Sequence, residues 1–259
     1  MAHKPSFNHL SLVGLPGSGK SRLAAHLLHV CQEQNIPLSI VESILPDLLD
    51  KNARVVCLVD VRSPWPDTLN ATELPDYFLK LLAVADAVML MFLASSDLDL
   101  QMHWQAQIQT RLNQIGAAKL PILRSFEGEL SASQLEKLWQ LPQNTPALKS
   151  DHLNPLQMPP WQTLVFKVGQ VNLTHLQMGL EGLRHSGLGL IWRIVGSFET
   201  PEYSHPVSLE FTPFRLDFYP AEQCTHQLTC WVSSQNVLVL EPLLQDLFKA
   251  CSVECRHST

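Results

Sequence analysis

The stretch Gly14-Leu-Pro-Gly-Ser-Gly-Lys20-Ser21 is the most informative part of this chain. It matches the pattern GxxxxGK[ST], in which glycines let backbone N–H groups turn inward around a phosphate. An apolar run, Leu10–Gly14, precedes the motif, and leucine and alanine recur at helical spacing over Ser21–Gln32 after it. We therefore predict a strand, a phosphate-binding loop and a helix whose N-terminus faces the phosphate.

The motif also assigns roles to individual side chains. Its lysine contacts the β- and γ-phosphates, and the hydroxyl that follows binds Mg²⁺. These roles fall to Lys20 and Ser21, so the expected ligand is a nucleoside triphosphate with Mg²⁺, either GTP or ATP. The alternative is a glycine-rich turn without a ligand, which the flanking strand and helix disfavour. The expected nucleotide-binding residues are Gly14, Gly17, Ser18, Gly19, Lys20, Ser21 and Arg22.

Two carboxylates close predicted strands. Asp60 ends the apolar run Arg54–Asp60, where a carboxylate can hold the metal directly or through water. We assign Asp60 to metal binding together with Ser21, and to catalysis together with Lys20. An acid at a strand end is also common as a helix cap, so that interpretation stays open. Glu42 ends the preceding apolar run in the same way and is the second choice for the metal.

Apolar runs alternate with helical stretches as far as Leu123. This alternation predicts βαβ units, and hence an α/β fold of the P-loop type with a mostly parallel sheet and helices on both faces. The expected strands are Leu10–Gly14, Ile36–Val41, Arg54–Asp60, Ala87–Leu93 and Leu120–Leu123, and the expected helices are Ser21–Gln32, Leu74–Ala85 and Leu98–Ile115.

The stretch Leu141–Pro160 contains five prolines, polar residues and little periodicity, which is typical of a linker. We place a P-loop nucleotide-binding domain at residues 1–150 and a smaller α+β domain at residues 151–259. The second domain is expected to contain a strand at Thr163–Val168, a helix at Leu173–Arg184, successive strands over Leu188–Val232 and a helix at Leu238–Cys251.

Composition excludes several classes of protein. The chain has 259 residues, 46% of them hydrophobic, and a net charge of −6, which disfavours a surface that binds nucleic acid. The start lacks the apolar segment of a secretory signal, and the longest apolar run, Leu81–Ala94, is interrupted by Asp86 and too short to span a membrane. Six cysteines without a small-domain framework are typical of reduced thiols. We expect a cytoplasmic protein without nucleic-acid or membrane partners.

Several motifs follow the phosphate loop in a fixed order: LVDVRSPW at 58–65, QAQI at 105–108, KLPILRSFEGE at 119–129 and LPQNTPAL at 141–148. This order resembles that of the CobW family of metal-chaperone GTPases. Ile191–Gly196 looks like the arginine-and-glycine strand of that family's C-terminal domain, and Cys230–Cys251 resembles its final strand and helix. The resemblance implies a CobW C-terminal-like second domain, GTP hydrolysis, and delivery of a metal ion to a client protein.

The chain departs from the family pattern at three points. The family's metal-binding GCxCC segment would fall within residues 42–54, which contain no cysteine. Its guanine-reading NKxD element would fall on residues 124–127, where Glu127 replaces the aspartate. Its γ-phosphate-sensing glycine would fall on Ser63 or Pro64, and a proline removes a backbone donor there. The departures imply slow or absent hydrolysis and loss of the usual metal cargo site.

Three functions remain open at this point. The first is a divergent CobW-like nucleotide-binding protein with slow hydrolysis coupled to metal or partner handling. The second is a non-catalytic regulatory or scaffold protein that retains the fold, and the third is an ATP-dependent small kinase, for which no arginine-rich lid is evident. A substitute metal site from Cys224, His226, Cys230, Cys251 and Cys255 is conceivable, although two of these cysteines lie in apolar stretches typical of buried thiols.

Overall fold

The computed structural model describes residues 5–15, 17–43, 53–63, 65, 74–142 and 161–253. The chain divides into two units, Met1–Gln157 and Met158–Thr259. The expected boundary at residue 150 lies outside the described residues, as does most of the expected linker. Leu141, at the start of that linker, is buried, and its carbonyl accepts a hydrogen bond from Arg54 Nε at 3.3 Å.

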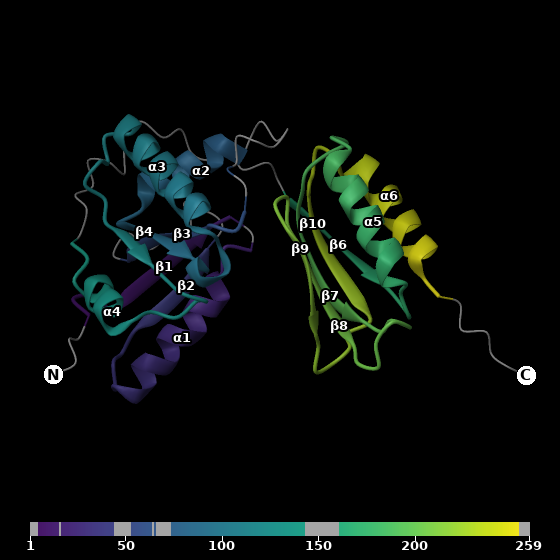
Figure 1. Ribbon diagram of the computed structural model, residues 1–259, viewed down its shortest axis with the longest axis horizontal. Coiled ribbons are helices and arrows are strands. Elements are labelled where there is room, and N and C mark those ends of the chain that lie inside the picture. Colours follow the sequence, from purple (N-terminus) through teal and green to yellow (C-terminus); the bar gives the residue numbers. More distant parts are fainter. Residues whose placement is uncertain are drawn as a thin grey trace, which may run out of the picture. The chain divides into compact units, whose positions relative to one another are not determined.

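The first unit is a parallel five-stranded sheet covered by helices (Figure 1). The strand order is β2-β1-β3-β4-β5, and every neighbouring pair is parallel. The α/β prediction is therefore confirmed at this level. The strands are β1 (His9–Gly14), β2 (Ser39–Ser43), β3 (Arg54–Asp60), β4 (Ala87–Met91) and β5 (Ile122–Arg124). The helices are α1 (Lys20–Glu33), α2 (Leu74–Val84), the short 3-10 helix η3 (Leu93–Ser95), α3 (Leu98–Gln114) and α4 (Ala132–Trp139).

The central strands are buried on both faces. Every residue of β3 and β4 is buried, which explains why these strands are almost continuously apolar. Leu23 and Leu27 of α1 and Trp139 of α4 share one core cluster with the sheet, while α2 packs against β1, β3 and α3. Asp86, the charge within the apolar run, is also buried, and its carboxylate accepts the Val55 N–H at 2.8 Å.

The expected bounds of three strands need correction, and one helix was not predicted. The second strand was expected at Ile36–Val41 but begins at Ser39, because Pro37 has no N–H to donate and the Ile36 N–H is bonded to Cys31 O at 2.9 Å. The fourth strand ends at Met91, before the expected Leu93. The fifth strand spans Ile122–Arg124, where Leu120–Leu123 was expected. Helix α4 was not anticipated from the sequence; it begins where the Ser131 side chain accepts the Gln134 N–H.

The second unit is an antiparallel sheet with two helices, as expected from the sequence (Figure 1). Its strand order is β6-β10-β7-β8-β9, and Leu180 of α5 and Leu244 of α6 join the core on one face of the sheet. The elements are β6 (Trp161–Lys167), α5 (Leu173–His185), β7 (Ile191–Phe198), β8 (Val207–Phe211), β9 (Leu216–Pro220), β10 (Gln227–Ser233) and α6 (Val237–Cys251). Among the described residues, no helix combines the length and hydrophobicity needed to cross a bilayer.

Gly196 lets β7 and β10 approach closely. A Cβ at this position would overlap the backbone carbonyl oxygen of Gln227 and meet Leu228 Cδ2 at 3.0 Å. By contrast, a Cβ at Gly182, within α5, would meet no atom within 4 Å. A side chain is therefore excluded by the neighbouring strand at Gly196, whereas the space around Gly182 admits one.

We predict that Gly196→Ala lowers the free energy of unfolding by about 2 kcal/mol or more, because backbone atoms must shift to admit the methyl group. Gly182→Ala, the matched control, should raise it by about 0.5–1 kcal/mol, since alanine favours a helix interior. Urea unfolding followed by circular dichroism measures both. Equal effects of the two substitutions would contradict the close approach at Gly196.

Candidate functional site

The predicted loop lies where a parallel sheet of this order binds ligands. β1 pairs with β2 on one side and with β3 on the other, so the strands that follow β1 in the sequence are added to opposite sides of it. Such a switch point leaves an opening beyond the carboxyl ends of the strands. Gly14, Glu42 and Asp60 all lie at the carboxyl ends of their strands, which explains why distant parts of the chain meet here.

The loop backbone requires its glycines. Gly17 and Gly19 have φ angles of 78° and 87°, in the left-handed region that other residues rarely adopt. A Cβ at Gly14 would lie 2.5 Å from Ser18 Oγ and 2.6 Å from Leu58 O. The chain therefore turns tightly over the end of β1, as the motif predicts.

The Lys20 side chain reaches back over this turn. Its Nζ donates to Gly14 O and Leu15 O, both at 3.0 Å, and lies 3.4 Å from Ser18 Oγ. Backbone oxygens of the loop accept the two shorter hydrogen bonds. Lys20 thus lies at the loop that the sequence assigned to phosphate binding.

The first turn of α1 contains basic residues and no acidic one. The last turn of the helix contains no basic residue, and no side chain caps its N-terminus. Lys20 and Arg22 instead lie in the first turn, where positive charge is unfavourable against the helix dipole. A bound phosphate would accept hydrogen bonds from the N-terminal N–H groups and offset this repulsion.

Ser21, the expected Mg²⁺ ligand, is joined to Glu42. Its hydroxyl donates to Glu42 Oε2 at 2.7 Å, across the parallel pairing of β1 with β2. Hydroxyl and carboxylate oxygens are hard ligands of the kind that Mg²⁺ prefers. The carboxylate that contacts the serine is therefore Glu42, which the sequence had made the second choice.

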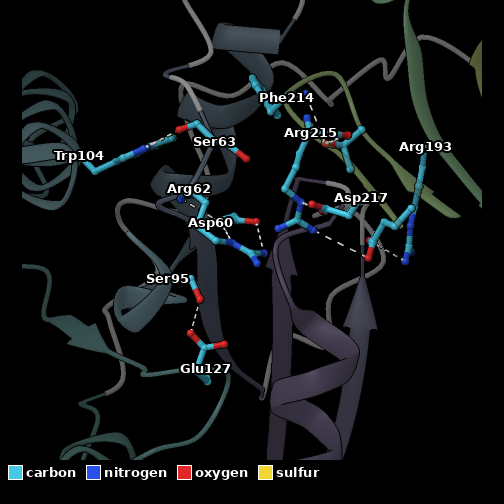
Figure 2. A network of polar contacts seen from close by, with 12 residues as sticks. Asp60, Arg62, Ser63, Ser95, Trp104, Glu127, Arg193, Phe214, Arg215 and Asp217 are labelled. Carbon is cyan, nitrogen blue, oxygen red and sulfur yellow. Dashed lines mark hydrogen bonds and ion pairs between the residues drawn. The ribbon is translucent and has the colours of Figure 1, made fainter. Parts of the chain in front are cut away.

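Asp60 lies at the predicted position, at the end of β3, but its carboxylate is bound by Arg62 (Figure 2). Oδ1 accepts the Arg62 backbone N–H at 3.0 Å and Nε at 2.9 Å, and Oδ2 accepts Nη2 at 2.8 Å. The exposed fractions of the two side chains are 8% and 19%, for Asp60 and Arg62 respectively. The role of Asp60 as a metal ligand and in catalysis stays a prediction.

Phe92 links this ion pair to the phosphate loop. Its φ of 61° is unusual for a bulky residue, and it takes the chain out of β4. The Arg62 guanidinium carbon lies 3.6 Å from the ring centroid, a cation–π distance, and that of Arg22 lies 5.8 Å away. A Cβ on Gly19 would come within 2.8 Å of Phe92 Cζ, so the ring lies directly against the loop.

The segment after β3 is fixed by aromatic packing. The Ser63 carbonyl accepts the Trp104 indole N–H at 2.8 Å (Figure 2). The rings of Trp65, Phe78 and Trp104 pack on one another, with centroids 4.8–6.2 Å apart. Ser63, one of the two positions that would replace the family's γ-phosphate-sensing glycine, is therefore buried and held. Pro64 lies outside the described residues.

Glu127 lies on a tight turn after β5. Glu127 and Gly128 both have positive φ, 56° and 88°, and the Glu129 N–H returns to Phe126 O at 3.0 Å. Ser95 donates a hydrogen bond to the Glu127 carboxylate (Figure 2). This contact links the turn to η3, which follows β4.

The turn also contacts the phosphate-loop helix. Gly128 lies against the Arg22 side chain, since a Cβ there would come within 2.7 Å of Arg22 Cγ. His26 of α1 accepts the Leu130 N–H at 3.2 Å. The structure thus connects this turn to α1, a relation that sequence spacing could not reveal.

A buried thiol lies beneath the loop. Burial raises the pKa of Cys57 to about 12, although the Lys20 ammonium lowers it in part. Burial also raises the pKa of Tyr77, and Cys57 adds to that rise. Both groups stay protonated at neutral pH and add no negative charge that would oppose a phosphate.

Charged side chains of β7, β8 and β9, together with Arg215 just before β9, pair within the second unit. Arg193 bonds to Glu210 at 3.1 Å and lies 6.0 Å from the Trp231 ring, while Arg215 pairs with Asp217 (Figure 2). Arg193 and Gly196, which carry the resemblance in this region, thus have structural roles here.

The conceivable cysteine metal site is not assembled in the part of the chain that the structure describes. Cys230 and Cys251 are buried in the core of the second unit, as the apolar alternative predicted. The described residues contain no group of three His, Cys, Asp or Glu side chains that could hold a metal ion. Cys255 lies outside these residues.

Comparisons with known proteins add little to this site. No protein-family model and no curated protein matches the sequence. The Zn(II)-bound YjiA GTPase from E. coli is 12% identical, with a TM-score of 0.33, over 97% of this chain and 100% of that one. A Zn(II)-bound triple mutant of YjiA GTPase is 11% identical, with a TM-score of 0.32 and the same coverage. Similarity this low says nothing about the function of this chain.

We predict that Gly19→Ala destabilises the first unit more than Gly116→Ala does. Both residues have positive φ, 87° and 72°, but a Cβ on Gly116 would meet no atom within 4 Å. Backbone strain alone should cost about 1 kcal/mol at Gly116, and the collision with Phe92 should add at least about 1 kcal/mol at Gly19. Chemical unfolding of the two variants measures the difference, and equal losses would rule out the contact with Phe92.

Proposed function

We propose that this protein binds a nucleoside triphosphate together with Mg²⁺, with GTP favoured over ATP. The observation that carries the proposal is the loop between β1 and α1, where Lys20 bridges Gly14 O and Leu15 O above a helix N-terminus without acidic residues. An ammonium held by loop carbonyl oxygens can turn to phosphate oxygens, which are stronger acceptors. The expected nucleotide-binding residues are Gly14, Gly17, Ser18, Gly19, Lys20, Ser21 and Arg22.

Ser21 and Glu42 suit the metal that accompanies the nucleotide. Their oxygens lie 2.7 Å apart, both side chains are exposed, and both are oxygen donors of the kind that Mg²⁺ prefers. Ser21 and Glu42 would hold Mg²⁺, which would neutralise part of the charge of the phosphates. Ser21 thus keeps its expected role, and Glu42 joins it.

The arrangement after β3 favours binding over rapid turnover. Asp60 is paired with Arg62, and Ser63 is held by Trp104. A segment fixed in this way responds weakly to the presence of a γ-phosphate, because it has few alternative positions. This arrangement suits one of two functions. The protein either hydrolyses the nucleotide slowly, or it has a non-catalytic regulatory role in which the bound nucleotide stabilises one conformation for a client protein. Cytoplasmic location belongs to the same proposal.

The preference for GTP rests on Glu127. A carboxylate accepts hydrogen bonds only, and guanine presents two adjacent donors, N1–H and N2–H, whereas adenine presents an acceptor at N1. Ser95 and the turn through Gly128 position Glu127 near the carboxyl ends of β4 and β5. A carboxylate there would accept hydrogen bonds from guanine N1–H and N2–H, whereas its oxygen would repel the lone pair of adenine N1.

We predict that Lys20→Ala weakens the binding of Mg·GTP roughly 10- to 100-fold, because charge-assisted hydrogen bonds to the phosphates are lost. Isothermal titration calorimetry measures the dissociation constant. Lys137→Ala, on the exposed side of α4, is the matched control and should bind like the wild type. Absence of Mg·GTP and Mg·ATP binding by the wild type, or equal binding after Lys20→Ala, would falsify the proposed function.

We predict that Glu127→Gln lowers the ratio of GTP affinity to ATP affinity by about tenfold or more. The amide oxygen accepts only part of the guanine contact, and the NH₂ group can now donate to adenine N1. Titrations with both nucleotides provide the ratio. Glu129→Gln, two residues away and exposed, is the control. An unchanged ratio in Glu127→Gln would mean that another group selects the base, while nucleotide binding itself would stand.

A further inference from the structure

The Asp60 carboxylate is engaged by a close neighbour in sequence. Three of its contacts come from Arg62, one from the backbone N–H and two from the guanidinium group, at 2.8–3.0 Å. Both carboxylate oxygens take part, and the forked geometry is the strongest that arginine can offer. The pair is mostly buried, so solvent screens it little. A cation therefore already accompanies Asp60.

Phe92 prevents Arg62 from leaving easily. The guanidinium carbon lies 3.6 Å from the centroid of this buried ring. At this distance the guanidinium and the ring attract each other through stacking and cation–π interactions. The Cζ end of the same ring contacts Gly19 of the phosphate loop. Arg62 is thus held from two sides, by Asp60 in one direction and by Phe92 in another.

The backbone on both sides of Arg62 is fixed as well. Asp60 belongs to β3, where it pairs with Met91 of β4, and the Val61 N–H is bonded to Met91 O at 3.4 Å. Ser63 N–H returns to Asp60 O at 3.2 Å, and its carbonyl binds Trp104. The ion pair is therefore part of a rigid turn and not a contact between two mobile surface chains.

We propose that Arg62 takes the place of a metal at Asp60, so that the divalent cation of the nucleotide is held by Ser21 and Glu42 and not by Asp60. Asp60 then acts as a counter-ion that positions Arg62, and Arg62 supplies fixed positive charge beside the phosphate loop through its stack on Phe92. This inference rests on the proposed function and concerns the same site.

The local charges agree with this division. Lys20, Arg22 and Arg62 are cationic, and Glu42 and Asp60 are anionic, so these five groups carry a net charge of +1 in a chain whose formal charge is −6. A cation bound at Asp60 would lie against the Arg62 guanidinium and would have to displace it. At Glu42 an incoming cation meets the neutral Ser21 hydroxyl, which can itself become a ligand.

The test is Mn²⁺ binding to GTP-loaded protein from which free nucleotide has been removed, measured by electron paramagnetic resonance titration of free Mn²⁺. The variants are Glu42→Gln, Asp60→Asn, Arg62→Ala and the double variant Asp60→Asn/Arg62→Ala. Glu42→Gln should weaken Mn²⁺ binding at least roughly tenfold, whereas Asp60→Asn should change it less than about threefold. Arg62→Ala should tighten it by roughly tenfold, because the Asp60 carboxylate becomes a new ligand. The double variant should lose that gain.

Three results would overturn the inference: unchanged Mn²⁺ affinity in Glu42→Gln, a loss of Mn²⁺ affinity of about tenfold or more in Asp60→Asn alone, or a gain in Arg62→Ala that persists in the double variant. Thermal unfolding of each variant identifies any that fail to fold. Asp60→Asn alone leaves the Arg62 guanidinium without its carboxylate. The double variant removes both charges together, so it tests the role of Asp60 without an unpaired arginine.

Nucleotide titration without metal separates this inference from the proposed function. The wild type can bind GTP more tightly than Lys20→Ala while Asp60→Asn loses Mn²⁺ affinity. In that case only the assignment of the metal ligands is wrong. When the wild type binds no GTP with Mn²⁺ or with EDTA, the proposed function fails and the inference fails with it.

Discussion

The candidate site exists because β1 pairs in parallel with both β2 and β3. The register places Leu12 beside Glu42 and Gly14 beside Leu58, so three strand ends meet at one edge of the sheet. The chain must turn sharply after Gly14 because Leu58 O and Ser18 Oγ leave no room for a side chain. Loop, helix dipole and carboxylates converge there because the strands are parallel.

Phe92 places an aromatic ring between the loop after β1 and the Arg62 guanidinium. The residue leaves β4 in a left-handed conformation and contacts Gly19, so a hydrophobic ring closes one side of the phosphate loop. Two arginines lie near the same ring, at 3.6 and 5.8 Å. The buried ring excludes water from the mostly buried pair of Arg62 with Asp60 and so strengthens that interaction. These basic side chains lie near the loop in a chain whose formal net charge is −6.

The second unit differs from the first in the type of its sheet. Its sheet is antiparallel, and its helices cover one face, so its strands alternate between core and half-buried positions, as in β8. Cys230 and Cys251 fill its core, and Gly196 admits the backbone of β10. Cys230, Cys251 and Gly196 are therefore accounted for by packing.

Elements with a strong local signal could be predicted before any coordinates were known. The loop Gly14–Ser21, the strand Arg54–Asp60 and the alternation of strands and helices follow from glycine spacing and periodicity, which depend on neighbouring residues alone. The contacts of Glu42 with Ser21 and of Arg62 with Phe92 emerged only from the folded chain. They depend on strand register and on side-chain direction, and neither is encoded within a short window of sequence.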